Sequence, residues 1–553
     1  MSHRRVPRPQ WPLLVALFLG VISIAALWFI LANPLDSSPD KDSEQRYVEA
    51  IVGSAARVNP LFAPLNDTDA DLASLVFSGL TRLGPDGEVL PDLAESWDIS
   101  DDGLSYTFHL KRDVTWHTGA AFTAEDAAFT YALLADPELP GDPALGQLWR
   151  QVSCSAAEEF TLLCQLPQPF APFISYTTVG ILPKHILESA TGATIADSAF
   201  NQAPAGTGPY RLAQLDQTKA ILRANPTYYG TKPAIDEIEV RFYPDPSTAA
   251  AALSRGDVQG LLMGPGVSQD DFDLLTSTPG LRAYTANRTA YTVLFLNNGQ
   301  TPFDDKALRQ AVALSINVDD IISNLLGGRA VRADSPIVPG TWAYNPQIEP
   351  RPHDTDQAKK LLDEAGWKTA EGGAIRQKEG NELRITLMTD QDPLRIAIAQ
   401  EIANQLAKVG IQVVVAPQGS ADLVGEFLVP HQYQAAIFGW DPGPDPDPYP
   451  AWHSSQVGPD GRNLAAYQNP DTDRMVEEAR QTTDLDKRQA LYYTFQQKFF
   501  EDVPSVLIYY PVFTYFVAEE VQNVTLGTLF QTSSRFADIT QWTIGETPQL
   551  IGG

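Results

Sequence analysis

Residues 91–134 constrain the fold more than any other stretch, because turn, strand and helix signals follow each other there without a gap. The Asp-Asp-Gly run at 101–103 is a turn signal. Residues 105–110 alternate apolar and polar side chains, which is the period of a half-buried strand. Thr123 precedes two acids in a first helical turn and is expected to cap a helix. The stretch therefore predicts strand and helix in close succession.

The same mixture continues towards the C-terminus. Residues 302–326 predict two helices, the first capped by Asp304 or Asp305. Residues 395–409 predict a helix that leads into the apolar, β-branched strand 411–416. The 553 residues exceed the roughly 250–300 at which a single hydrophobic core stops growing. We therefore expect a mixed α/β protein with two or more domains.

Residues 11–32 carry no charge, and as a helix rising about 1.5 Å per residue they are long enough to cross a bilayer. Basic residues precede this segment and acids follow it, so we expect a cytoplasmic tail at 1–10, a transmembrane anchor and an extracytoplasmic body. Residues 33–45 are polar and rich in proline and serine, as in a flexible linker. A cleaved signal peptide is the alternative, although Ile30 occupies a position where cleavage after Ala32 requires a small residue.

Charge excludes one class of partner. From Asp36 onward the chain has 36 basic and 68 acidic residues, a balance of -32, since three of its 39 basic residues precede this point. Such a body repels nucleic acid. Hydrophobic residues make up 44% of the chain, which is typical of a folded globular protein.

The chain has two cysteines, Cys154 and Cys164. A hairpin centred near Glu159 places them opposite each other, at the Cα separation of about 4.5 to 5.5 Å that a disulfide bond can span. We expect this disulfide in an oxidising compartment. Two buried free thiols are the alternative, whereas the seven scattered histidines give no metal-ligand spacing with the pair.

The order of signals in residues 91–134 resembles the extracytoplasmic solute-binding proteins of peptide-type ABC transporters, family 5. Other segments match the family in the expected order, and together they extend the resemblance over about residues 47–542: 58–61, 206–211 (GTGPYR), 225–230 (NPTYYG), 296–304, 365–373 (AGWKTAEGG) and 439–456.

The resemblance implies an α/β clamp of two lobes and an extra small domain, with mixed sheets and a two-strand hinge near Ala290 and Thr514. Its expected parts are lobe I at 46–83, 201–290 and 515–545, the small domain at 84–200, and lobe II at 291–514. It also implies a monomer without cofactor that captures a small solute, such as an oligopeptide, outside the membrane. Such a protein delivers the solute to an ABC permease and its ATPase and is not an enzyme.

Residues 440–452 carry most of the candidate ligand contacts. Their acids alternate with prolines, so the carboxylates are presented on a stiff backbone, and aromatic side chains supply flat apolar walls. In peptide-binding relatives, an aspartate three residues after the matching tryptophan pairs with the ligand's amino group. That position is Gly443 here, and we expect Asp441 or Asp445 to replace it. The candidate ligand-binding residues are Asn59, Trp440, Asp441, Asp445, Tyr449 and Trp452.

Three other interpretations remain open. The acids of this loop can simply be solvated. A surface hydrolase acting on peptides or glycans is a second, with Asp445 and Asp447 as acid and base, although no recognisable hydrolase motif accompanies them. The third is a membrane-tethered ligand sensor with the same fold, although the ten-residue tail offers no output domain.

Overall fold

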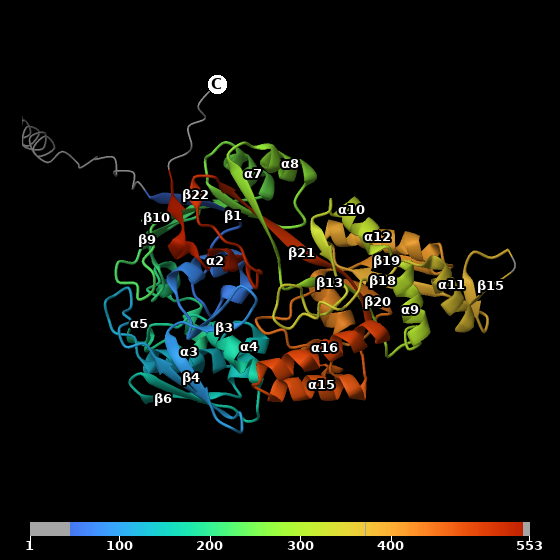
Figure 1. Ribbon diagram of the computed structural model, residues 1–553, viewed down its shortest axis with the longest axis horizontal. Helices are drawn as coiled ribbons and strands as arrows, with labels where there is room; N and C mark the ends of the chain where they lie inside the picture. Colours follow the sequence, from blue (N-terminus) through green and yellow to red (C-terminus); the bar gives the residue numbers. More distant parts are fainter. Residues whose placement is uncertain (1–44, 371, 460, 546–553) are drawn as a thin grey trace, which may run out of the picture. The chain divides into compact units, whose positions relative to one another are not determined.

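The computed structural model describes residues 45–370, 372–459 and 461–545. The body of the protein is the compact unit that begins at Tyr47. Figure 1 shows this body as two lobes with a small additional domain, the arrangement of a clamp.

Within the described residues, one mixed sheet of twelve strands extends through both lobes in the order β19-β18-β20-β13-β21-β11-β1-β10-β9-β8, and β12 and β14 also pair with β21. Its strands are β1 (Arg46–Val52), β8 (Tyr210–Leu215), β9 (Lys219–Ala224), β10 (Glu237–Tyr243), β11 (Gly260–Met263), β12 (Leu281–Asn287), β13 (Tyr291–Leu296), β14 (Ala330–Arg332), β18 (Arg384–Thr389), β19 (Gln412–Pro417), β20 (Ala435–Trp440) and β21 (Ser505–Ala518).

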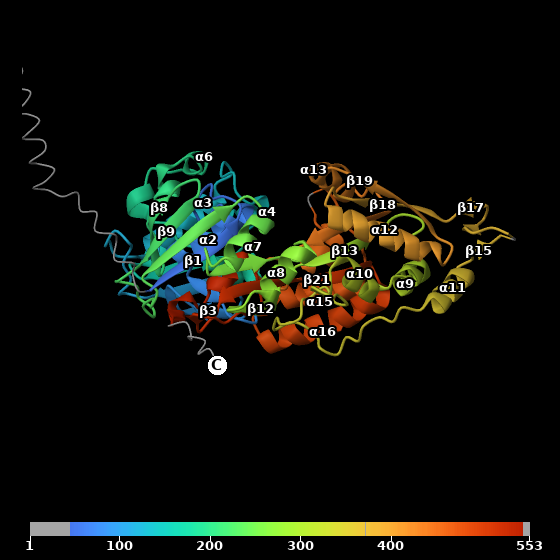
Figure 2. The same cartoon turned by 90° about the horizontal axis from the view of Figure 1, so that it is seen from above.

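Strand β21 belongs to both lobes, as Figures 1 and 2 show. Its first part pairs with β13 and β14, and its last part, from Val512, pairs with β12 and β11. The short link between β12 and β13 is the second crossing, and there the Arg288 amide donates to the Pro511 carbonyl at 3.0 Å. Two neighbouring backbone segments thus connect the lobes, which is the geometry of a two-strand hinge.

The small domain contains a four-stranded antiparallel sheet in the order β4-β5-β7-β6. Its elements are β3 (Val89–Pro91), β4 (Ala94–Ile99), β5 (Ser105–Leu110), α3 (Ala124–Ala135), α4 (Pro143–Trp149), β6 (Ser153–Glu158), β7 (Thr161–Gln165), η2 (Ala171–Thr178), α5 (Lys184–Leu187) and α6 (Gly192–Ile195). At its borders with lobe I lie β2 (Thr81–Leu83), which pairs with β3, and η3 (Ala199–Gln202).

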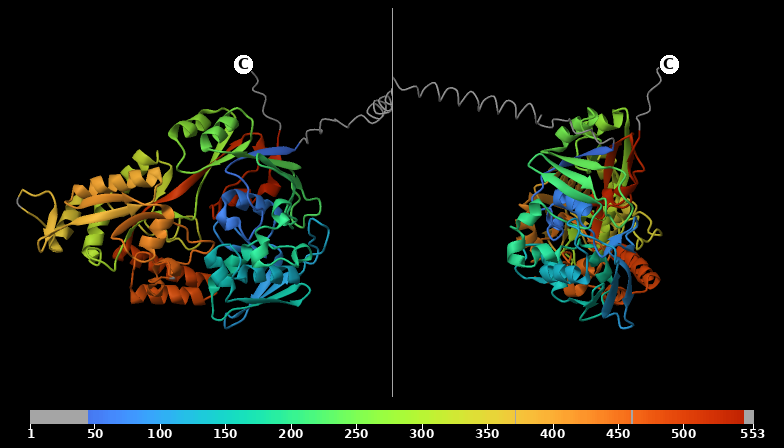
Figure 3. Two further views of the ribbon diagram at one scale, coloured as in Figure 1. Left: turned by 180° about the vertical axis from the view of Figure 1, so that it is seen from behind. Right: turned by 90° about the vertical axis from the view of Figure 1, so that its left-hand side faces the viewer.

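Helices cover the sheet in both lobes (Figure 3). Lobe I has η1 (Ala63–Leu65), α2 (Asp67–Val76), α7 (Pro246–Ser254), α8 (Gln269–Ser277), β22 (Val521–Gln522), η6 (Thr532–Phe536), η7 (Ile539–Gln541) and β23 (Thr543–Ile544). Lobe II has α9 (Lys306–Ser315), α10 (Val318–Leu325), α11 (Thr355–Glu364), β15 (Lys368–Thr369), β16 (Arg376–Lys378), β17 (Asn381–Glu382), α12 (Pro393–Ala407), α13 (Ser420–Asp422), η4 (Leu423–Leu428), α14 (Tyr449–Trp452), η5 (Ser454–Gln456), α15 (Pro470–Gln481) and α16 (Leu485–Asp502).

The hydrophobic cores divide at the hinge. One large core contains side chains of both lobe I and the small domain, from Tyr47 through Trp116 to Trp542. Two other cores, one including Leu294 and Ile398 and the other Val293 and Phe495, lie within lobe II. Because a continuous core holds its members together, lobe I and the small domain form one body and lobe II another.

The local predictions are confirmed closely. Strand β5 occupies residues 105–110, and Thr123 makes a capping box at the start of α3. The expected helix pair is α9 and α10, and Asp305 rather than Asp304 caps the first. Helix α12 starts two residues before the expected Arg395, because Asp392 accepts hydrogen bonds from the amides of Leu394 and Arg395.

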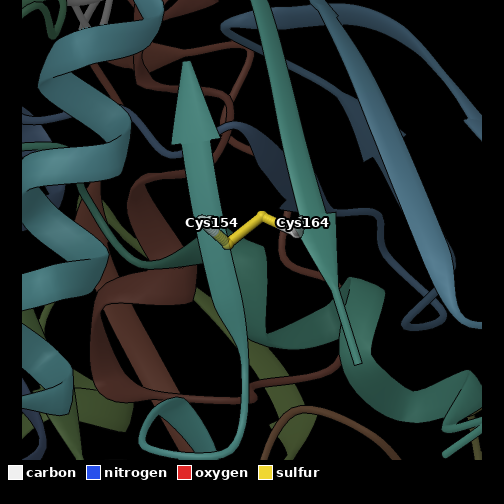
Figure 4. The surroundings of a disulfide bond; sticks show 2 residues. All are labelled: Cys154 and Cys164. Carbon is white, nitrogen blue, oxygen red and sulfur yellow. A yellow bond between two sulfur atoms is a disulfide. The ribbon is translucent and has the colours of Figure 1, made fainter. Parts of the chain in front are cut away.

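Cys154 and Cys164 lie opposite each other in the β6–β7 hairpin and form a disulfide bond (Figure 4). The predicted anchor at 11–32, like the tail and most of the linker, lies outside the described residues. Across the part of the chain that the structure describes, no helix is both long and apolar enough to span a bilayer.

Candidate functional site

The loop that follows β20 lies at the junction of the lobes. Strand β20 ends at Trp440, which pairs with Tyr291 on β13 directly beyond the hinge link. The loop then turns at Gly443, where φ is +86°, a conformation that favours glycine. The Gly443 amide donates to Asp441 Oδ1 at 2.9 Å, so the turn is tied to the carboxylate two residues earlier. Helix α14 begins at Tyr449 and ends the loop.

Asp445 is held by a buried ion pair. Its carboxylate accepts from Arg488 Nη2 at 2.8 Å and Nη1 at 3.3 Å, and from the Ser175 hydroxyl at 3.3 Å. Arg488 also donates to the Tyr492 hydroxyl at 2.8 Å. Asp445 and Arg488 are both buried, so the pair links the loop to α16 in an environment where the charges are desolvated.

Asp447 is paired in the same way with the preceding helix. Arg480 Nε, on α15, donates to Asp447 Oδ2 at 2.7 Å. Burial raises the pKa of Asp447 above its usual value, against the opposing effect of Arg480. The Arg480 guanidinium lies 4.0 Å from the centre of the Tyr449 ring. Both acids at the far end of the loop are thus occupied by arginines of the same lobe.

Asp441 differs from the other two acids. Its nearest cation is Arg288 in the hinge link, at 3.6 Å between Nη2 and Oδ2, and Arg288 also lies 3.9 Å from Asp67 of α2. The Asp441 side chain is 44% exposed. Burial raises its pKa, while the Gly443 amide and Arg288 act in the opposite direction. Of the three loop acids, Asp441 is the one with the longest ion pair and the most contact with water.

The aromatic candidates are placed differently from one another. Trp440 and Tyr449 are half-buried at the edge of a lobe II core, and Tyr449 stacks on His453 at 4.1 Å. Trp452 is 1% exposed and packs edge-on against Phe499 at 4.6 Å, so it belongs to the core. Ligand binding by these residues stays a prediction.

Asn59 is buried, and its side-chain amide is satisfied within lobe I. Its Nδ2 donates to Asn201 Oδ1 at 2.9 Å, and its Oδ1 accepts from the Leu61 amide at 3.0 Å. These side-chain hydrogen bonds go to Asn201 and Leu61 and not to the loop after β20, and a ligand contact of Asn59 stays a prediction.

A small pocket at the lobe junction includes residues that the sequence did not single out. It encloses about 320 Å³ of space free of atoms, part of it open to solvent. Its walls come from five stretches of the chain and are mostly apolar, with the hydroxyl groups of two threonines: Gly87, Thr289, Pro336, Ile337, Val338, Thr341, Trp342, Pro442, Gly443, Pro444, Pro446 and Phe530. No short-range signal unites these residues, because the hinge topology alone brings them together. Among the described residues, no group of three or more His, Cys, Asp or Glu side chains is arranged to hold a metal ion.

A family model described as bacterial extracellular solute-binding proteins, family 5 middle region, matches residues 88–461. The chain is similar to the oligopeptide-binding protein AppA of Bacillus subtilis, with 29% identity over 90% of this chain and 93% of that protein. It is also similar to the nickel-binding periplasmic protein of Escherichia coli, with 30% identity over 76% of this chain and 80% of that protein.

Two solved structures show the same architecture. The structure of Bacillus subtilis AppA with a nonapeptide has a TM-score of 0.70 and 28% identity, covering 91% of this chain and 99% of that one. The structure of Campylobacter jejuni NikZ with Ni(L-His) has a TM-score of 0.71 and 26% identity, covering 90% and 99%. The clamp fold expected from the sequence is confirmed by these matches.

Proposed function

The chain belongs to the bacterial extracellular solute-binding proteins of family 5 and is the substrate-binding component of an ABC importer, and we propose that its solute is an oligopeptide or a peptide-like molecule. The choice of ligand depends on the similarity to AppA, which extends over 90% of this chain. AppA has been solved in complex with a nonapeptide. Proteins of this kind bind their solute outside the cytoplasm and work with a membrane permease and its ATPase.

A metal chelate is the second candidate ligand. The similarity to the nickel-binding protein and to the Ni(L-His) complex of NikZ supports it. Relatives of the same architecture bind a nonapeptide in one case and Ni(L-His) in another. We rank the peptide first because the AppA similarity covers more of both chains.

The proposed mechanism is capture by closure. Two bodies with separate cores are joined by β21 and the β12–β13 link, so they can rotate about these two crossings. A solute between them shifts the population towards closure to the extent that it binds the closed form more tightly. We assign lobe I to 46–83, 201–290 and 515–545, the small domain to 84–200, and lobe II to 291–514. No covalent step on the solute is proposed.

Asp441 is the proposed partner for a cationic group of the solute, such as a peptide amino group. Asp445 and Asp447 already have short ion pairs with Arg488 and Arg480, whereas the contact of Asp441 with Arg288 is long. A guest ammonium group can therefore approach Asp441 without breaking a tight pair.

The remaining proposals concern the N-terminus and the assembly. Residues 11–32 are proposed to anchor the protein in the membrane, because they carry no charge and have basic residues before them and acids after them. The protein is proposed to act as a monomer, with residues 33–45 as its linker.

The test uses the full chain in detergent. Mass spectrometry of solutes that co-purify, followed by thermal-shift titration with di- to nonapeptides and with nickel-histidine, is expected to show binding of a peptide and recovery of that peptide unchanged. Absence of a shift with every probe would contradict solute capture of this class. Conversion of the peptide to products would favour the hydrolase instead.

A further inference from the structure

Arg480 contacts both bodies of the clamp. Its Nε donates to Asp447 at 2.7 Å, and its guanidinium lies over the Tyr449 ring at 4.0 Å, both within lobe II. The guanidinium also lies 4.8 Å from the centre of the Phe170 ring, which belongs to the small domain and directly precedes η2. Arg480 thus contacts two aromatic rings, one from lobe II and one from the small domain.

Two further contacts cross the junction. The Ser175 hydroxyl of η2 donates to Asp445 at 3.3 Å, and the Trp342 amide, nearer the hinge link, donates to the Asp86 carbonyl at 3.0 Å. Figures 1 and 3 show α15 and α16 side by side next to the small domain, and α15 contacts η2. The contact between α15 and η2 lies away from the two hinge crossings in both figures, so a rotation that opens the lobes about the hinge separates α15 from η2.

The contacts of Arg480 within lobe II do not depend on closure of the lobes, whereas its contact with the small domain does. Its ion pair with Asp447 and its stacking on Tyr449 stay within lobe II and persist when the lobes separate. Its contact with Phe170 exists only when they are closed. An interaction made only in one state shifts the population towards that state, and a partly buried cation on an aromatic face is favourable.

Closure is also linked to the shape of the loop. Asp445, Asp447 and Tyr449 lie in the stretch that begins at Trp440, and arginines of α15 and α16 hold both acids. Because Arg480 contacts both this loop and the small domain, closure of the lobes is coupled to the position of the loop.

We propose that Arg480 is a positioning residue that latches lobe II to the small domain through Phe170 and holds the loop after β20 in its ligand-ready shape. This inference rests on the proposed function insofar as closure serves to enclose a solute. Phe170 is its partner across the junction, and Ser175 adds a second, weaker tie through Asp445.

The experiment measures the ratio of closed to open molecules. Fluorophores on Ile186→Cys in the small domain and Val414→Cys in lobe II, two exposed positions, report the distance between the bodies by single-molecule energy transfer in the full chain. Measurements are made without solute and during titration with a nonapeptide mixture. Phe170→Leu is expected to lower the closed-to-open ratio and to raise the midpoint of peptide-induced closure by about three- to tenfold.

Matched variants separate a latch from general damage. Phe170→Tyr keeps the ring and is expected to behave like the wild type. Phe160→Leu removes a ring of the same domain that lies 5.4 Å from Arg112, a cation–π contact that does not cross the junction, and is expected to leave the ratio unchanged. Arg480→Lys keeps a cation beside Asp447 but loses the planar guanidinium, and is expected to add nothing to the effect of Phe170→Leu in the double variant.

Several outcomes would overturn the latch. The first is a closed-to-open ratio of Phe170→Leu equal to that of the wild type, and the second is an equally lowered ratio in Phe160→Leu. The third is a double variant whose ratio falls by the sum of the two single effects. The fourth is a wild type in which the two fluorophores never come as close as they lie in this structure. A wild type that closes without solute, responds to Phe170→Leu and ignores every peptide would contradict the peptide proposal while leaving the latch supported.

Discussion

At the scale of single residues, the buried ion pair of Asp445 and Arg488 holds the loop on α16, but each charge depends on the presence of the other. Removing one partner of such a pair leaves the other charge buried and uncompensated, which typically costs about 3 to 5 kcal/mol. Asp445→Ala is therefore expected to lower the free energy of unfolding by about that amount, measured by urea denaturation. Adding Arg488→Met should recover most of the loss, because the unpaired cation is then gone.

Asp356→Ala is the control for this prediction. Its carboxylate is 94% exposed and lies 3.6 Å from Lys359, so its loss should cost less than about 0.5 kcal/mol. A double variant as unstable as Asp445→Ala alone would show that the uncompensated charge is not the cause.

The proposed role of Asp441 predicts a pH dependence. Burial raises its pKa, so this carboxylate takes up a proton at a higher pH than an ordinary aspartate and loses its attraction for a cation. Affinity for a peptide with a free amino terminus should therefore fall as the pH decreases through that raised pKa. Arg288, Asp67 and the Gly443 amide face this carboxylate and set where the fall occurs.

Isothermal titration at several pH values tests this prediction. Asp441→Asn is expected to weaken binding at neutral pH by about tenfold or more, the equivalent of one charge-assisted hydrogen bond, and to flatten the profile. The same peptide with an acetylated amino terminus should show little dependence on Asp441. Equal pH profiles for the free and acetylated peptides would show that Asp441 does not bind the amino group of the peptide.

At the scale of elements, the disulfide bond secures an edge of the small sheet. Strand β6 is the terminal strand of that sheet and is mostly exposed, and Cys154 links it to Cys164 on the more buried β7. Closing a loop of this length restricts the unfolded chain by about 2 to 3 kcal/mol. In the double variant Cys154→Ala/Cys164→Ala, the body formed by lobe I and the small domain should lose about that much stability, measured by calorimetry. Wild-type protein in reducing agent should match the variant, and an unchanged transition in both would contradict the prediction.

Elements show how far the sequence alone could reach. Strand β5, the capped helix α3 and the α9–α10 pair were predictable because their signals are local. The three loop acids look equivalent in the sequence, since each is followed by a proline. What separates them is the arrival of Arg480 and Arg488, which follow Asp447 and Asp445 by 33 and 43 residues. The pocket wall likewise depends on hinge topology, so residues such as Phe530 carried no signal.

At the scale of the whole molecule, a buried ionic cluster joins the two ends of lobe I. Arg535 of η6 donates to Glu49 of β1 at 2.9 Å and to Asp71 of α2 at 2.7 Å. Burial raises the pKa of both acids, against the opposing effect of Arg535. The cluster lies in the body whose core also includes the small domain, and lobe II has cores of its own. Loss of this cluster should therefore destabilise the body formed by lobe I and the small domain and leave lobe II stable.

Arg535→Met is expected to destabilise lobe I and the small domain together by about 3 to 5 kcal/mol at neutral pH, because two buried acids lose their cation. Hydrogen exchange should rise in β1, α2 and β5 while α12 stays protected. Since the folded acids hold protons at a higher pH than the unfolded ones, the deficit should shrink as the pH falls. Equal loss of protection in α12 would show that the molecule unfolds as one unit.

The route of β21 through both lobes also fixes the order in which a growing polypeptide can finish its parts. Lobe II is complete once residues near Tyr510 have emerged, whereas lobe I begins with β1 and still lacks the end of β21, Arg535 and Trp542. Until these late residues arrive, Glu49 and Asp71 have no arginine partner and the apolar side chains around Tyr47 remain uncovered. Lobe I is therefore the part whose synthesis begins first and whose fold is completed last, and until then its apolar side chains and its two acids remain exposed to water.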